Sequence, residues 1–412
     1  MRIAHVLRRI SFDDWGGTEQ VVWNIAKAQK AAGHDVRLFT TTALWRGKDD
    51  LQDKLGWRNG RLEIIDGIEI FRFKPIYPWW PMPKSIVAEL DSKGGNPFVP
   101  GLGKAIREWH PDVIHCHAMA RIAELCFRTA RKIGVKCAIS LHGGGVNVPT
   151  VEAESLKAPT RGRFPWGKMI DCAMGWTRRV PEDADGIVCV GEDEFEHYSL
   201  RHKHVLRLPC GVDLSLFKDA GHPRIHSGSV EHPSRKQTTI LCVARIDRQK
   251  NQMMLVEWLA RHPDSAIRLV GPVTQPDYRA ELERRAAELG VSDKIVFTGS
   301  LKPASDELLA EYRNADILVL PSRHEPFGTV VLEAWAVGLP VVASNVGGLG
   351  RNCAAHPGAA ILFPSGDAAA LDAAVSAALE KTQEMSAAGL AAATEYDWRT
   401  LALRLVDFYA EI

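Results

Sequence analysis

Two carboxylates stand in a segment whose residue types suit a polar, anionic ligand. Glu325 and Glu333 are eight residues apart, after an apolar run, in a stretch that turns through Pro326 and Gly328 and then takes helical spacing. A helix that begins at the carboxyl edge of a strand presents unpaired backbone N–H groups and a partial positive charge. The two carboxylates could then contact different parts of one extended ligand. Taken alone, the segment also fits two solvated helix carboxylates.

Cations stand in a second segment, VARIDRQKN at 243–251, which follows another apolar run. This is the position at which the first loop of a doubly wound sheet meets phosphate. Arg245 offers a fixed fork of donors and Lys250 a mobile ammonium, a pairing suited to a diphosphate. These cations could neutralise a departing diphosphate in place of a metal. A solvated basic turn is the alternative, and it is the better interpretation for Arg248.

The amino-terminal half contributes glycines and a histidine. Gly16 and Gly17 precede a helical pattern, so backbone can approach a ligand there without a Cβ in the way. His142 ends an apolar strand, where it would point into a ligand cleft. A purely structural histidine is the alternative.

Metal-binding residue types also occur at His115-Cys116-His117, which ends an apolar run. Alternate residues of a strand point to opposite faces, so we expect these consecutive positions not to converge on one ion. A structural or pocket-edge role is favoured over a metal site, which would recruit further ligands elsewhere. Asp183 and Asp185 could mimic a metal-binding carboxylate pair, but such a pair is common in turns.

Several classes of protein are disfavoured by what the chain lacks. There is no G-x-x-x-x-G-K-[ST] and no G-x-G-x-x-G, and the HGGG at 142–145 has no G-x-S-x-G nucleophile motif to accompany it. The 51 Lys and Arg against 50 Asp and Glu give a formal charge of +1, which provides no attraction to nucleic acid. Eight cysteines without a C-x-x-C pair predict reduced, mostly buried thiols.

The 412 residues suffice for two or three domains, and short apolar runs alternate with amphipathic ones as in parallel sheets flanked by helices. We expect an α/β fold of two doubly wound domains, at 1–208 and 237–394, joined by a linker at 209–236 and facing across a cleft. We expect a helix at 395–412 to pack toward the first domain. The strands expected in the two domains span 3–7, 36–40, 113–116, 135–141, 186–190 and 204–208, then 239–243, 267–270, 294–298, 317–320, 340–343 and 360–363.

Two insertions interrupt the first domain. Residues 45–61 are charged and glycine-punctuated, and residues 75–100 hold so many prolines that we expect no regular element there. With no apolar run long enough to span a membrane and no signal-peptide pattern, we expect the protein to be made and kept in the cytosol.

Taken together, these segments resemble the retaining glycosyltransferases of the GT-B fold, specifically glycosyltransferase family 4. The resemblance covers essentially the whole chain. It is carried by GGTE near the start, LHG at 141–143, GVD at 211–213, VARIDRQKN, LVGP at 269–272, FTGSL at 297–301 and, most specifically, EPFGTVVLE at 325–333. After Gly347-Gly348 the family commonly places Glu, whereas this chain reads LGRN at 349–352, so we expect that loop to hold something different.

The resemblance implies the roles of individual residues in binding a nucleotide-sugar donor. Glu333 would bind the ribose hydroxyls, Glu325 the donor-sugar hydroxyls, and Arg245 and Lys250 the diphosphate. Glu325, His142, Arg245 and Lys250 would form the catalytic group, with His142 beside the sugar. The remaining donor-binding positions would be Gly16, Gly17, Gly271, Leu301, Phe327, Gly328 and Thr329.

The activity implied is metal-independent transfer of a sugar with retained anomeric configuration, from a UDP-sugar or, as the second choice, a GDP-sugar. The acceptor would be a hydroxyl of a saccharide or a lipid-linked molecule, in cell-surface polysaccharide or glycolipid synthesis. No cofactor and no nucleic acid are expected. A non-catalytic nucleotide-sugar-binding protein on the same frame, or a GT-B epimerase or hydrolase, is the alternative.

Acceptor binding is expected in the first domain, where residues 157–180 hold six basic residues against one acidic residue, Asp171. Phe164, Trp166 and Trp176 are interleaved with them. Such a segment could attract an anionic or lipid-linked acceptor, or make peripheral contact with the inner face of a membrane. A solvated loop and helix face is the equal alternative.

Overall fold

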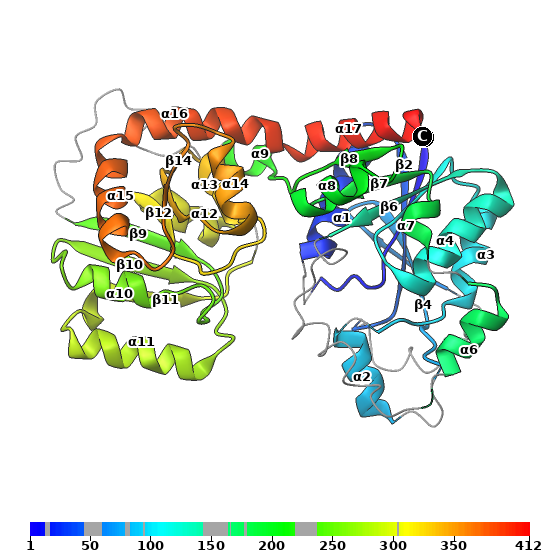
Figure 1. Ribbon diagram of the computed structural model, residues 1–412, viewed down its shortest axis with the longest axis horizontal. Coiled ribbons are helices and arrows are strands. Elements are labelled where there is room, and N and C mark those ends of the chain that lie inside the picture. Colours follow the sequence, from blue (N-terminus) through cyan, green and yellow to red (C-terminus); the bar gives the residue numbers. More distant parts are fainter. Residues whose placement is uncertain are drawn as a thin grey trace. The chain divides into compact units, whose positions relative to one another are not determined.

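The computed structural model divides into two compact units, which are described separately (Figure 1). The first comprises residues 1–209 and 398–412, and the second residues 210–397. The residues that the structure describes are 1–12, 17–44, 60–78, 83–93, 95–142, 164, 166–176, 179–218, 237–302 and 305–412.

The described part of the first unit holds an eight-stranded sheet in the order β3-β4-β2-β1-β5-β6-β7-β8. All neighbours are parallel except the hairpin β3–β4, which turns through Asp66 and Gly67 with positive φ. The strands are β1 (Arg2–Val6), β2 (Asp35–Thr41), β3 (Arg61–Ile65), β4 (Ile68–Phe73), β5 (Val113–Cys116), β6 (Lys136–Leu141), β7 (Gly186–Cys189) and β8 (Val205–Arg207).

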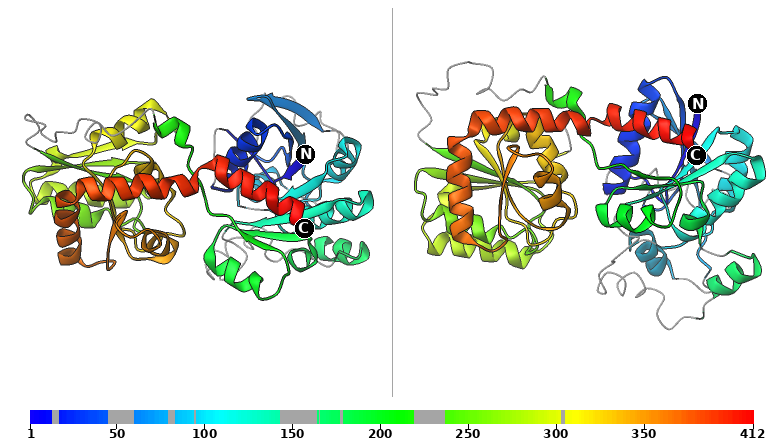
Figure 2. Two further views of the ribbon diagram at one scale, coloured as in Figure 1. Left: turned by 90° about the horizontal axis from the view of Figure 1, so that it is seen from above. Right: turned by 45° about the horizontal axis from the view of Figure 1, so that its top comes forward.

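Helices cover both faces of this sheet. One face packs on α3 and α4, while His5 and His115 on the opposite face contact Gln29 of α1 and Tyr409 of α17. The helices are α1 (Gly17–Ala31), α2 (Lys84–Lys93), α3 (Pro100–Trp109), α4 (Ala120–Ile133), α6 (Trp166–Ala173), α7 (Val180–Asp183), α8 (Glu192–Ser199) and α17 (Trp398–Glu411). The last helix of the chain thus completes the first unit, and the two chain ends lie close together in Figure 2.

The second unit has a six-stranded parallel sheet, within the described residues, in the order β11-β10-β9-β12-β13-β14. Numbered from its own first strand, this is 3-2-1-4-5-6, the doubly wound order of dinucleotide-binding folds. The strands are β9 (Thr238–Val243), β10 (Ser265–Val270), β11 (Ile295–Gly299), β12 (Ile317–Leu320), β13 (Val341–Ser344) and β14 (Ala360–Phe363).

The helices of the second unit flank this sheet, and the chain turns sharply from α15 into α16 (Figure 2). They are α9 (Leu214–Lys218), α10 (Met253–Leu259), α11 (Pro276–Glu288), α12 (Asp306–Asn314), α13 (Thr329–Ala336), α14 (Gly347–Ala354), α15 (Ala368–Glu380) and α16 (Thr382–Ala393), with short 3₁₀ helices at Ser292–Lys294 and Thr394–Tyr396. Trp335 of α13 is fully buried, and its indole donates to the Ala359 carbonyl at 2.8 Å.

The prediction that residues 75–100 hold no regular element is wrong. The prolines flank α2 rather than interrupt it, Pro100 occupies the first turn of α3, where its missing N–H costs nothing, and Ile76 bridges to Phe98. The first insertion also ends earlier than predicted, because Arg61 already belongs to β3. Of the predicted linker 209–236, Leu214–Lys218 forms α9, and residues 219–236 lie outside the described residues.

All eight cysteines are free thiols, and six of them are buried, which confirms the prediction made from their spacing. In the part of the chain that the structure describes, no helix combines the length and apolarity needed to cross a membrane.

Candidate functional site

The switch point of the second sheet lies between β9 and β12, where the strand order reverses. Ligands of open α/β sheets bind at the carboxyl ends of the strands at such a point. The loop after β9 holds Arg245 and Lys250, and the loop after β12 holds Glu325. A backbone hydrogen bond from Arg323 N to Gln249 O, 2.8 Å long, ties the two loops together.

Lys250 and Glu325 form an ion pair at the centre of this site. Lys250 Nζ donates to Glu325 Oε2 at 2.5 Å, and the two side chains are 11% and 17% exposed. The structure therefore brings together two residues that the sequence placed on different segments. A ligand diphosphate could bind the ammonium of Lys250, and a ligand hydroxyl could bind the carboxylate of Glu325.

Arg245 stands at the exposed side of the same loop. Its guanidinium lies 3.3 Å from Asp247 Oδ2, and half of its side chain is exposed. Asp247 itself is buried and accepts the backbone N–H groups of Gln249 and Lys250 through Oδ1, at 3.0 and 3.1 Å. Asp247 thus fixes the loop that carries both cations, a role the sequence analysis did not assign.

Glu333 lies on α13 and is positioned by a buried tyrosine. The Tyr312 hydroxyl, from α12, donates to Glu333 Oε2 at 2.5 Å. Burial raises the pKa of Glu333 above its usual value, although this hydrogen bond opposes the shift. The carboxylate is thereby oriented before any ligand arrives.

Glycines allow the loops of the second unit to approach one another. A Cβ on Gly271, at φ +147°, would lie 2.1 Å from the Ala244 carbonyl oxygen, so this glycine holds the end of β10 against the Arg245 loop. Gly328, at φ +79°, caps the start of α13, and its Cβ would meet Leu349 at 2.6 Å. These two predicted donor-binding positions therefore shape the backbone of the site.

The start of α14 supports the Glu325 loop. A Cβ on Gly348 would lie 1.8 Å from the Pro326 carbonyl oxygen, and Asn352 Nδ2 donates to the Phe327 carbonyl at 3.0 Å. Asn352 belongs to the LGRN segment at 349–352, so this segment is tied to the backbone of the Glu325 loop. Phe327 and Leu301 are partly buried, while Thr329 is exposed at the first position of α13.

The first unit has a pocket of its own, about 480 Å³, at the switch point between β1 and β5. It is lined by the loop after β1, the start of α1 and the start of α4, and includes Arg8, Arg9 and Gly17. Arg9 Nε donates to Glu19 Oε1 at 2.7 Å, and a Cβ on Gly17 would meet nothing within 4 Å. Gly16 lies outside the described residues.

His142 follows β6 and contacts His117, a lining residue of this pocket, through its Nε2 at 3.1 Å from His117 Nδ1. Burial lowers the pKa of His142 to about 4, so the ring is neutral at pH 7. The glycines at 143–145 lie outside the described residues.

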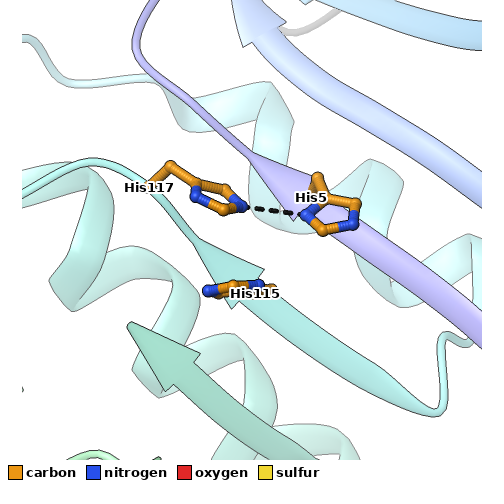
Figure 3. Close-up of side chains that lie close together, drawn as sticks. All are labelled: His5, His115 and His117. Atoms are coloured by element: carbon orange, nitrogen blue, oxygen red, sulfur yellow. Dashed lines mark hydrogen bonds between the residues drawn. The ribbon is translucent and has the colours of Figure 1, made fainter. Parts of the chain in front are cut away.

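His117 is itself part of a group of three histidine side chains. Ring nitrogens of His5, His115 and His117 all lie within 4.8 Å of one another, and Figure 3 shows the three rings grouped across β1 and β5. The expectation that 115–117 would not converge holds for Cys116, which packs into the core on the other face, but is wrong for the two histidines. Two residues apart on a strand, they share a face.

Both carboxylate oxygens of Asp185 have partners within the first unit. Asp185 Oδ2 accepts the Cys137 backbone N–H at 2.9 Å, and its other oxygen lies 3.4 and 3.6 Å from the side chains of Arg131 and Lys136. This arrangement agrees with the structural interpretation.

Of the basic and aromatic segment, the structure describes 164, 166–176 and 179–180. Asp171 forms a buried pair with Arg121, with bonds of 2.7 and 3.0 Å. Exposed apolar side chains cover α6 and its flanks: Phe164, Trp166, Met169, Ile170 and Met174. Of the six basic residues, Lys157, Arg161, Arg163 and Arg178 lie outside the described residues.

Two family models match the chain. Residues 15–216 match the model described as Glycosyltransferase Family 4, and residues 229–394 match Glycosyl transferases group 1. A D-inositol 3-phosphate glycosyltransferase of Arthrobacter sp. is 31% identical over 316 residues, which cover 73% of this chain and 71% of the relative. One of Geodermatophilus obscurus is 36% identical over 248 residues, but the match spans only 56% of this chain and 53% of the relative.

Among solved structures, the Anabaena protein Alr3699/HepE in complex with UDP-glucose is similar over 100% of both chains, with a TM-score of 0.63 and 17% identity. At this identity the similarity concerns the fold.

Proposed function

Because the chain belongs to glycosyltransferase family 4, and so to the glycosyltransferase class of enzymes, we propose that it transfers a sugar from a nucleotide-sugar donor with retained anomeric configuration. The observation that carries this proposal is the Lys250–Glu325 pair beside Arg245 at the switch point of the second sheet. Lys250 would offer its ammonium to a diphosphate, and Glu325 beside it would offer its carboxylate to sugar hydroxyls.

The donor would bind to the second unit with its diphosphate on Arg245 and Lys250. Glu325 would accept hydrogen bonds from the sugar, and Glu333, oriented by Tyr312, from the ribose hydroxyls. A UDP-sugar is favoured, in line with the UDP-glucose bound to the Anabaena protein of the same fold, and a GDP-sugar is the second choice. The two cations supply the charge that a divalent metal would otherwise provide, so metal-independence is part of the proposal.

The chemical step would be a displacement on one face of the sugar. The bond from the anomeric carbon to the phosphate oxygen breaks, and the bond to the acceptor oxygen forms on the same face. The departing phosphate oxygen takes the proton of the acceptor hydroxyl, while Arg245 and Lys250 stabilise the charge that develops on the diphosphate.

The acceptor would bind to the pocket of the first unit, between the loop after β1 and the start of α4. Its arginine lining and its size suit a saccharide, including one that carries an anionic or lipid-linked group. We also propose peripheral contact of α6 with an anionic membrane surface, supported by its exposed aromatic and aliphatic side chains near the basic residues of the segment. Synthesis of cell-surface polysaccharide or glycolipid would place the enzyme at the cytoplasmic face.

The test is a thermal-shift screen of UDP- and GDP-sugars in excess EDTA, followed by NMR of the product formed from the best donor and a panel of sugar and polyprenyl-linked acceptors. An α-linked product from an α-configured donor is expected. An inverted linkage would contradict the retaining mechanism. Conversion of the donor to an epimer, or to free sugar alone, would show an epimerase or a hydrolase instead.

A further inference from the structure

Four imidazoles line up on one face of the first sheet. His5 lies on β1 and pairs in register with His115 on β5, while His117 and His142 follow the ends of β5 and β6. In the sheet order, β1, β5 and β6 are consecutive neighbours, so the four rings lie side by side across three strands. His5, His115 and His117 are completely or almost completely buried, and Figure 3 shows the bond between His5 and His117.

Three of these rings form a continuous chain of hydrogen bonds that begins at Gln29 of α1. Gln29 Oε1 lies 2.7 Å from His5 Nε2, His5 Nδ1 lies 2.9 Å from His117 Nε2, and His117 Nδ1 lies 3.1 Å from His142 Nε2. His115 stands beside the chain, with its Nε2 2.7 Å from Ser140 Oγ and its Nδ1 2.5 Å from the Tyr409 hydroxyl.

All four rings are neutral at pH 7. Burial lowers the pKa of His5 and His142 to about 4, and it holds the pKa values of His115 and His117 well below the usual 6.5. A neutral imidazole carries one N–H, so it donates through one nitrogen and accepts through the other. In a chain of neutral imidazoles, the tautomer of each ring therefore determines that of the next.

The carbonyl oxygen of Gln29 sets the direction of this chain. Because an amide oxygen only accepts, His5 carries its proton on Nε2 and accepts through Nδ1. His117 then donates through Nε2 and accepts through Nδ1, which places the proton of His142 on Nε2. The Nδ1 of His142, which has no hydrogen-bond partner among the described residues, keeps its lone pair.

A metal ion fits these rings less well than the hydrogen bonds do. Both ring nitrogens of His5, His115 and His117 already have partners. The group of His5, His115 and His117 includes no carboxylate. A divalent cation would therefore bring uncompensated charge into a buried site.

We infer that Gln29, His5 and His117 are positioning residues that hold His142 in the Nε2–H tautomer, so that its Nδ1 accepts a hydrogen bond from a hydroxyl of a saccharide bound to the first unit. This inference rests on the proposed function only for the identity of that hydroxyl. It makes His142 selective for a ligand group that can donate, because a bare acceptor at the same place would face the Nδ1 lone pair.

The experiment is long-range ¹H–¹⁵N NMR of the full chain with labelled histidine, which distinguishes protonated from unprotonated ring nitrogens. The His142 signals are assigned by their disappearance in His142→Gln. The wild-type protein is expected to show His142 with its proton on Nε2. Gln29→Met and His117→Phe, which interrupt the chain at different points, should each convert His142 to a mixture of tautomers.

Loss of one oriented hydrogen bond should lower kcat/KM in Gln29→Met by about tenfold. The matched control is Ser140→Ala, which removes a partner of His115 and leaves the chain intact. It should leave the His142 tautomer unchanged and kcat/KM within about twofold of wild type.

Three results would overturn the inference: a wild-type His142 protonated on Nδ1, a His142 tautomer unchanged in both Gln29→Met and His117→Phe, or stoichiometric Zn²⁺ binding that replaces the His5–His117 signals. The NMR result does not depend on transfer activity. The expected tautomers in a protein that transfers no sugar would therefore refute the proposed function and leave the hydrogen-bonded chain established.

Discussion

At the scale of single residues, the candidate site is defined by competition for Lys250. In the structure its ammonium is held by Glu325, whereas the proposed mode of donor binding would have it meet a diphosphate. In that mode Glu325 would have two effects on a ligand: its charge would oppose the phosphates, and its oxygens would bind the sugar. One substitution separates these effects.

Glu325→Gln should bind UDP several-fold more tightly than wild type, because the ammonium of Lys250 is released to the diphosphate, a gain of about 1 kcal/mol. The same variant should lower kcat for sugar transfer by about 100-fold, because the carboxylate no longer orients and stabilises the sugar. Calorimetry and steady-state kinetics measure the two effects. Glu281→Gln, a helix carboxylate paired with Arg248, is the matched control and should change neither. Equal UDP affinity and full turnover in Glu325→Gln would remove this residue from the site.

At the scale of elements, the neutral imidazoles link the stability of the first unit to pH. Because their pKa values are lowered in the folded state, the unfolded chain binds protons from about pH 6.5 downward while the folded chain does not until about pH 4. Their contribution to stability is complete above pH 6.5 and is lost as the pH falls toward 4.

As the pH is lowered below 6.5 toward 4, the free energy of unfolding should therefore fall by about 1.4 kcal/mol per pH unit for each of these histidines. Urea unfolding at pH 7, 6 and 5 measures the slope. His115→Gln, which can keep hydrogen bonds to Ser140 and Tyr409, should reduce it by one histidine's share. A flat dependence between pH 7 and 5 would show that the rings are charged or exposed in the folded protein.

The apolar face of α6 is the element that tests membrane contact. We expect co-sedimentation with vesicles that contain phosphatidylglycerol at low salt and little with phosphatidylcholine alone, because basic side chains and interfacial aromatics act together. Trp166→Ser with Met169→Ser should weaken binding markedly. Leu200→Ser, which removes a highly exposed leucine elsewhere on the first unit, is the control. Failure of the wild-type protein to sediment with anionic vesicles would end this proposal.

At the scale of the whole molecule, most strands could be predicted from apolar runs alone, and Val113–Cys116, Ile317–Leu320 and Ala360–Phe363 match the structure residue for residue. The hairpin β3–β4 was missed, although Asp66-Gly67 between two alternating runs is a typical turn signal. The helix α2 was missed because the prolines around it obscured its own helix-compatible sequence.

Contacts between distant segments could not be predicted in the same way. Nothing local in the sequence pairs Lys250 with Glu325 or Tyr312 with Glu333, since each pair depends on which strands become neighbours in the sheet. The strand order also explains why His5 meets His117, a contact between residues 112 positions apart. The resemblance to family 4 suggested the roles of individual residues. The strand order explains why the loops after β9 and β12, the first and fourth strands of the second sheet, meet.

The most direct test of the account is calorimetric titration of UDP and GDP into the protein in excess EDTA. We predict binding at a single site, weakened at least about 100-fold in Arg245→Ala with Lys250→Ala, since each charge-assisted contact contributes about 1.5 to 3 kcal/mol. Arg248→Ala, in the same loop but paired with Glu281 at the surface, should bind as the wild type does. Wild-type affinity in the double variant, or binding that appears only when Mg²⁺ is restored, would contradict a metal-free diphosphate site on the second unit.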